Sequence, residues 1–111
     1  MIKEEFINKW KSQVKKGTLS FIVLKALHKK ELLYGYELIE YIKSKTDIDI
    51  AEGTLYPLMN RLKKAEMATS EWVEQESGIP RKYYRLTQEG KDTLVKMQEY
   101  WSELESSIKK V

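Results

Sequence analysis

The sequence predicts a mainly α-helical fold that carries one small β-hairpin. Apolar residues recur at helical spacing in several segments, the period becomes strand-like between residues 67 and 86, and a long helical period then returns. A chain of 111 residues is one domain by default, with a modest core. Two parts are expected within it, residues 1–87 and a C-terminal helix over residues 88–111.

Composition limits the classes of function. The chain is 41% hydrophobic and 33% charged, which is typical of a globular protein. It has no cysteine, which excludes disulfides, zinc fingers and thiol chemistry. It shows no signal-peptide pattern and no apolar stretch long enough for a bilayer, so a cytoplasmic protein without a membrane partner is expected. No catalytic triad, metal-ligand cluster or phosphate-binding glycine loop occurs, so we expect neither an enzyme nor a cofactor.

The first expected helix covers residues 4–15. A tryptophan so near a terminus indicates docking, either on the chain's own core or on a second subunit. Gly17 is predicted to end this helix and Thr18 to cap the next one. Leu19–Leu27 is apolar almost all round, so it should run through the core, and the lone His28 is interpreted as a helix-end residue. The apolar face of the first helix consists of Phe6, Ile7, Trp10 and Val14.

A helix from Tyr34 to about Lys45, a short turn and a further helix within residues 51–64 form a helix-turn-helix. The start of the last of these helices has two alternatives. Asp49 as a cap places it near Ala51, whereas Pro57 favours a later start with Thr54 as the cap. Its apolar stripe is Leu55, Leu58, Met59 and Leu62.

The opposite face of this helix is polar and cationic. Such a face suits a DNA major groove, although an ordinary surface helix also has a charged side. It carries Thr54, Tyr56, Pro57, Asn60, Arg61, Lys63 and Lys64.

Residues 67–76 and 81–86 flank a Ser-Gly-Ile-Pro turn and predict a two-stranded hairpin. Three helices followed by a hairpin is the winged helix-turn-helix plan, with residues 78–82 as the wing tip. Although the net charge is only +3, bases gather on the fourth helix and the wing. The wing bases are Arg81, Lys82 and Arg85.

The last helix should run from about Gln88 to Lys109, capped by Thr87. Its apolar residues are spaced three, four, three and four apart, as in a coiled-coil seam. This spacing favours pairing with another subunit over folding back on the same domain. The seam consists of Leu94, Met97, Trp101, Leu104 and Ile108.

Four motifs occur in order along the chain: Lys16-Gly17-Thr18-Leu19, Tyr34-Gly35-Tyr36-Glu37, Glu52-Gly53-Thr54-Leu55-Tyr56-Pro57 with Arg61-Leu62, and Gly78 with Pro80-Arg81-Lys82-Tyr83-Tyr84, Leu86-Thr87 and Gly90. Taken together, they resemble the motifs of the PadR-like bacterial transcription regulators, in their short subgroup with a single C-terminal helix. The resemblance implies a homodimer that is joined through its N-terminal and C-terminal helices and that binds a palindromic DNA operator, usually as a repressor. Residues 1–87 would then be the DNA-binding domain, and residues 88–111 the dimerisation helix. It also implies release, in some members, by a small aromatic effector held beside a tryptophan of the last helix.

The expected roles follow from these patterns. Tyr56, Asn60 and Arg61 should lie near base edges, and Thr18, Tyr36, Lys63 and Lys64 near phosphates, with Arg81 and Lys82 on the wing and Thr54 and Pro57 in the same interface. Trp101, Met97 and Trp10 are expected at the effector site, and Phe6, Trp10 and the seam at the dimer contact. The alternative function is a protein-interaction module that uses the same face.

Overall fold

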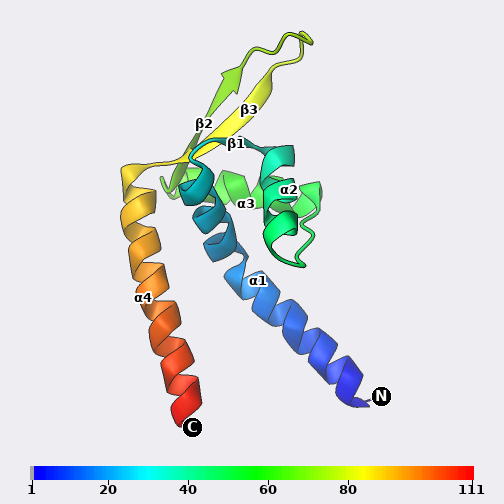
Figure 1. Ribbon diagram of the computed structural model, residues 1–111, viewed down its shortest axis with the longest axis vertical. Helices are drawn as coiled ribbons and strands as arrows, with labels where there is room; N and C mark the ends of the chain where they lie inside the picture. The colour runs from blue at the N-terminus through cyan, green and yellow to red at the C-terminus, as the bar shows by residue number, and fades with distance from the viewer. Residues whose placement is uncertain (1) are drawn as a thin grey trace.

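The structure is a computed structural model that describes residues 2–111 and measures 53 × 34 × 23 Å. It confirms a mainly helical fold with a small sheet (Figure 1). The elements are α1 (Ile2–Lys30), β1 (Leu33–Tyr34), α2 (Gly35–Lys45), α3 (Glu52–Lys64), β2 (Ala68–Val73), β3 (Arg81–Leu86) and α4 (Gln88–Lys110). The β2–β3 hairpin projects from one end of the molecule, and the free ends of α1 and α4 lie at the other.

Helix α1 is continuous, so the prediction of a separate helix over residues 4–15 is wrong. Gly17 does not end the helix, and no atom would crowd a side chain added there. The Thr18 hydroxyl donates to the Val14 carbonyl at 2.8 Å, so it bonds back within the helix instead of capping a new one. A glycine in a helix interior costs only about 1 kcal/mol, and the many helix-forming residues on both sides outweigh that.

The core lies where the C-terminal half of α1 meets α2, α3 and the base of the sheet. Val23, Leu24 and Leu27 of α1 are at most 1% exposed, as the apolar run predicted. The predicted apolar stripe of α3 is also confirmed, because Leu55, Leu58, Met59 and Leu62 are all buried.

The two helices of the helix-turn-helix begin differently. At α2, the Glu37 carboxylate accepts a hydrogen bond from the Tyr34 N–H at 3.2 Å. Helix α3 begins at Glu52 after Ala51, with no side-chain cap, so neither Asp49 nor Thr54 caps it. Pro57 therefore lies inside α3, where it removes one helical hydrogen bond.

The sheet has three antiparallel strands in the order β1-β3-β2, not the two predicted. Strand β1 pairs Leu33 with Tyr84 and Tyr34 with Tyr83. Two residues are too few to show strand alternation, so the sequence pattern alone missed this strand. Its pairing fixes the base of the hairpin beside the start of α2.

Helix α4 is fixed at its start by backbone contacts to the segment after α3. The Thr87 hydroxyl accepts from the Gly90 N–H at 2.9 Å, as the predicted cap, and donates to the Glu66 carbonyl at 2.6 Å. The Thr87 N–H donates to the Met67 carbonyl at 3.1 Å. Of the seam residues, Leu94 enters the core and Met97 packs against it, whereas Trp101, Leu104 and Ile108 are exposed. Within residues 2–111, no helix has the length and apolarity that a bilayer crossing demands.

Candidate nucleic-acid interface

Helix α3 presents a polar face to solvent. Tyr56, Asn60 and Arg61 are exposed on it, together with Thr54, Pro57 and Lys64, and Lys63 is half-buried. Within residues 2–111, ion pairs join Lys43 to Asp49, Arg85 to Glu71 and Lys109 to Glu105. The cations of α3 take no part in these pairs, so their charge is not neutralised by neighbouring carboxylates.

An aromatic cluster joins the start of α2 to α3. The Tyr56 side chain lies directly over Gly35, where an added Cβ would stand 2.5 Å from the Tyr56 hydroxyl oxygen. Tyr34 stacks on Tyr36 with ring centroids 6.4 Å apart. Since only a glycine leaves this space, Gly35 sets the position of Tyr56 on the exposed face. The glycine and its two flanking tyrosines form one motif in the sequence, but only the fold shows that the motif supports α3.

The wing brings further cations to this face. The Arg81 guanidinium lies 4.5 Å from the centre of the Tyr34 ring, a cation–π distance that holds it against the base of the wing. Lys82 lies beside Lys63 of α3. Partial burial, and then the positive charge of Lys82, lower the pKa of Lys63 below its usual value of 10.5. Two neighbouring ammonium groups that repel each other provide a favourable position for an anion.

Two expected participants lie elsewhere. Arg85, counted among the wing bases, points to the outer face of the hairpin and pairs with Glu71 at 3.0 Å, which neutralises much of its charge. Thr18 lines a groove between α1 and α4, with its hydroxyl bonded within α1. The structure therefore does not bring Thr18 together with the residues of α3 and the wing.

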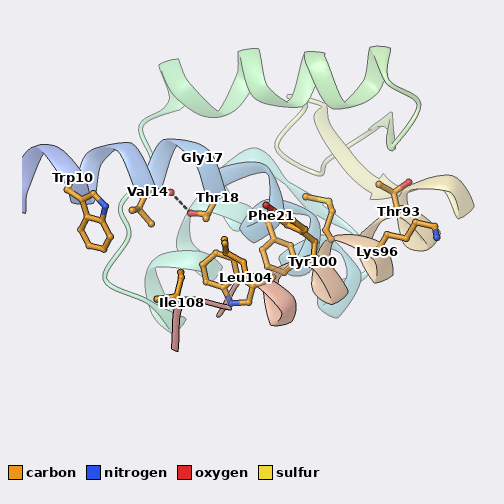
Figure 2. A pocket seen from close by; sticks show the side chains of 12 residues that line it. Trp10, Val14, Gly17, Thr18, Phe21, Thr93, Lys96, Tyr100, Leu104 and Ile108 are labelled. Atoms are coloured by element: carbon orange, nitrogen blue, oxygen red, sulfur yellow. Dashed lines mark hydrogen bonds between the residues drawn. The ribbon is translucent and has the colours of Figure 1, made fainter. Parts of the chain in front are cut away.

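The groove between α1 and α4 is the second candidate site. Figure 2 shows side chains of both helices facing one another across it, with the Val14–Thr18 hydrogen bond at its edge. Phe21 and Trp101 approach with ring centroids 6.1 Å apart. The groove has a volume of about 680 Å³. Its lining includes the seam residues Met97, Trp101, Leu104 and Ile108, together with Trp10 and Tyr100.

Apolar side chains of α1 and α4 remain exposed in the single chain. Trp10 is 52% exposed, Phe6 70% and Ile108 66%. Trp10 therefore does not dock on the core of its own domain. Contact of Trp10 with a second subunit stays a prediction.

A helix-turn-helix, an antiparallel wing and an unneutralised cationic face define a winged-helix DNA-binding protein. Comparison with known proteins narrows this class. The model of the transcriptional regulator PadR-like family matches residues 23–96, and the chain belongs to this family. Its members regulate transcription by binding DNA and typically dimerise.

The chain is similar to several relatives over most of its length. A PadR family transcriptional regulator from Eggerthella lenta is 35% identical, with a TM-score of 0.88, and the match covers 99% of this chain and 95% of that one. A PadR-like transcription factor from Bacteroides fragilis is 40% identical, with a TM-score of 0.77 and 91% and 96% covered. An uncharacterized protein of Lysinibacillus sphaericus is 34% identical over 100 residues, which are 88% of this chain and 91% of the relative.

Proposed function

We propose that the chain is a homodimeric repressor that binds a palindromic DNA operator. The observation that carries this proposal is the joint cationic face of α3 and the wing. Among the residues that the structure describes, no carboxylate pairs with its cations, which are Arg61, Lys63, Lys64, Arg81 and Lys82. Helix α3 would enter the major groove, where Asn60 and Arg61 can read base edges. Tyr56, Thr54 and Pro57 lie along the same exposed face, and Tyr36 flanks it at the start of α2.

The dimer contact is proposed at the groove between α1 and α4. Its apolar rim would lose water on contact with a second copy, which gives about 25 cal/mol for each Å² of apolar surface covered. A two-fold pair places its recognition helices in successive major grooves roughly 34 Å apart, which is why a palindromic site is expected. Ile108→Glu, at a position 66% exposed in the single chain, should weaken the dimer and leave the fold intact.

Salt dependence of duplex binding tests the first part of the proposal. Because the face neutralises phosphates, the logarithm of the affinity should fall linearly with the logarithm of the salt concentration, with a slope of about −0.9 for each phosphate contacted. Lys64→Met should reduce the steepness of this slope by about one such unit. Lys109→Met is the matched control, because Lys109 pairs with Glu105 near the far end of α4. If random duplexes do not bind even at low salt, the face is a protein-interaction surface instead.

Selection of bound sequences from a random duplex pool tests the operator. A recovered inverted repeat supports the dimer, and a single half-site contradicts it.

The groove between α1 and α4 has a volume in the range of small-molecule sites, roughly 300–1,000 Å³. A planar aromatic effector held between Trp101, Met97 and Trp10 should quench tryptophan fluorescence and lower operator affinity. Both effects should be lost in Trp101→Ala, and quenching without any change in operator affinity would refute the regulatory role.

A further inference from the structure

Trp72 lies on the core-facing side of the wing but outside the core. In the β2–β3 ladder, Ala68 pairs with Leu86, Ser70 with Tyr84 and Trp72 with Lys82. Alternate residues of a strand share one face, so Trp72 lies on the same face as Ala68. Ala68 is 4% exposed, whereas Trp72 is 67% exposed. The inward-facing row therefore continues past the edge of the core and ends in a large indole that is mostly exposed.

The indole borders a cleft between the wing and α3. This cleft has a volume of about 450 Å³, and its lining includes Tyr56 and Asn60 of α3 and Trp72, Arg81 and Lys82 of the wing. The Lys82 ammonium lies 5.7 Å from the centre of the Trp72 ring. An apolar surface and a cation are thus side by side on one wall, opposite the exposed face of α3.

A duplex strand has the matching chemistry. Its backbone alternates anionic phosphates with deoxyribose rings whose faces are largely apolar, and most protein contacts to DNA go to these two groups. A strand that leaves the groove occupied by α3 and passes under the wing must cross this cleft. The cations around the cleft exclude a cationic occupant and favour an anionic one. Tryptophan suits such a boundary because its ring is apolar and its N–H can still donate.

We propose that Trp72 is a DNA-contacting residue, whose indole packs against a deoxyribose of the strand that crosses the cleft. Lys82, with Lys63 as its neighbour, holds the adjacent phosphate. This inference rests on the proposed DNA-binding function and adds to it a contact that carries no charge. Trp72 therefore contributes affinity by covering the sugar, without releasing a counterion.

Affinity measured across salt concentrations separates this contact from the ionic ones. Trp72→Ala should weaken duplex binding about tenfold, in the range of aromatic stacking on nucleic acid, and leave the salt slope unchanged. Lys82→Met should weaken binding and reduce the slope by about 0.9. Val73→Ala is the matched control, since Val73 is the next residue of the strand and points to the opposite face. It should change the affinity less than twofold. Trp72→Phe should recover most of the loss.

Fluorescence gives an independent measurement. In the double variant Trp10→Phe and Trp101→Phe, Trp72 is the one remaining indole. Saturation with duplex should lower the acrylamide quenching of Trp72 severalfold.

Two results would overturn the inference while DNA binding itself stands. One is unchanged quenching at saturation, and the other is Trp72→Ala binding as tightly as the natural chain. If the natural chain binds no duplex at any salt concentration, the proposed function fails and the inference fails with it. Because Trp72 is mostly exposed, Trp72→Ala should keep its melting temperature, and this separates lost contact from lost fold.

Discussion

Replacement of Gly90 by alanine is expected to displace α4 from the end of α3. A Cβ at Gly90 would overlap the Met67 carbonyl oxygen and stand 3.0 Å from the carbonyl carbon. These are backbone atoms, so no side-chain rotation relieves the overlap. Met67 is also fixed, because its N–H donates to the Leu62 carbonyl at 2.9 Å and its carbonyl accepts from Thr87. The start of α4 must therefore move.

The expected magnitude comes from two opposing effects. Overpacking of this kind costs about 1–3 kcal/mol, and alanine gains up to about 1 kcal/mol over glycine within a helix. With the full gain subtracted, the net loss is about 0–2 kcal/mol of unfolding free energy, and the upper half, about 1–2 kcal/mol, is expected because the overlap is with backbone atoms. With an unfolding entropy of about 2.1 cal/mol/K per residue, the melting temperature of a chain of this length should fall by roughly 4–9 °C.

Gly53→Ala is the matched control. Gly53 lies in the first turn of α3, and no atom would stand within 4 Å of an added Cβ. This change should raise the melting temperature by about 2–4 °C, because it keeps the helix-propensity gain without the overlap. Thermal unfolding should be followed by circular dichroism at equal protein concentrations, since dimerisation makes the midpoint depend on concentration. If Gly90→Ala is at least as stable as Gly53→Ala, the close approach of α4 to Met67 is not a real constraint.

Three further changes test the neighbouring contacts. Thr87→Ala removes the cap of α4 and should lower the unfolding free energy by about 1–2 kcal/mol in a urea titration. Thr87→Ser should recover most of this loss. An unaltered urea midpoint in Thr87→Ala would contradict the capping role. Gly35→Ala should displace the exposed Tyr56 side chain and weaken duplex binding severalfold. Its melting temperature should stay within a few degrees of the natural value. Unchanged affinity would show that this position of Tyr56 does not matter for DNA binding. Lys82→Met should raise the pKa of Lys63 in an NMR titration of its side chain. Since the folded-state pKa of Lys63 lies below its unfolded value, the repulsion is fully present below that folded pKa and is relieved as the pH rises through it. The gain in unfolding free energy from Lys82→Met should therefore become smaller at alkaline pH. A gain that does not change with pH would show that it does not come from repulsion between Lys63 and Lys82.

The sequence predicted the parts of the fold that depend on repeated local patterns. The apolar stripe of α3 follows from a period of 3.6, and its residues are buried as expected. The period of 2 in β3 puts Tyr84 and Leu86 on one face, and the fold turns that face toward the core. The break at Gly17 was wrong because a single glycine is a weak signal, and α1 has helix-forming residues on both sides. Strand β1 was missed because its partner, β3, lies some fifty residues away in the chain.

The candidate site could also be predicted from the sequence only in part. Residue type and spacing were enough to predict that the exposed face of α3 is cationic and polar. They were not enough to show that Arg85 is paired with Glu71, since that contact depends on the register of the hairpin. Nor could they single out Trp72, because alternation gives the face on which a residue lies but not where the core ends. The functional assignments of individual side chains stay predictions until binding is measured.

The turn after α3 connects the three parts that matter for DNA recognition. Helix α3 ends at Lys64, Glu66 takes a positive φ of 62°, and β2 begins at Ala68. Between them, Met67 is bonded to α3 through its N–H and to Thr87, before α4, through its carbonyl. The recognition helix, the wing and α4 therefore meet within a few residues of backbone, whereas the N-terminal half of α1 is exposed and free of such contacts. If the groove binds a ligand as proposed, a rotation of the start of α4 would also move Met67, because its carbonyl accepts from Thr87. The end of α3 would then respond to the ligand without any contact between the ligand and the DNA face.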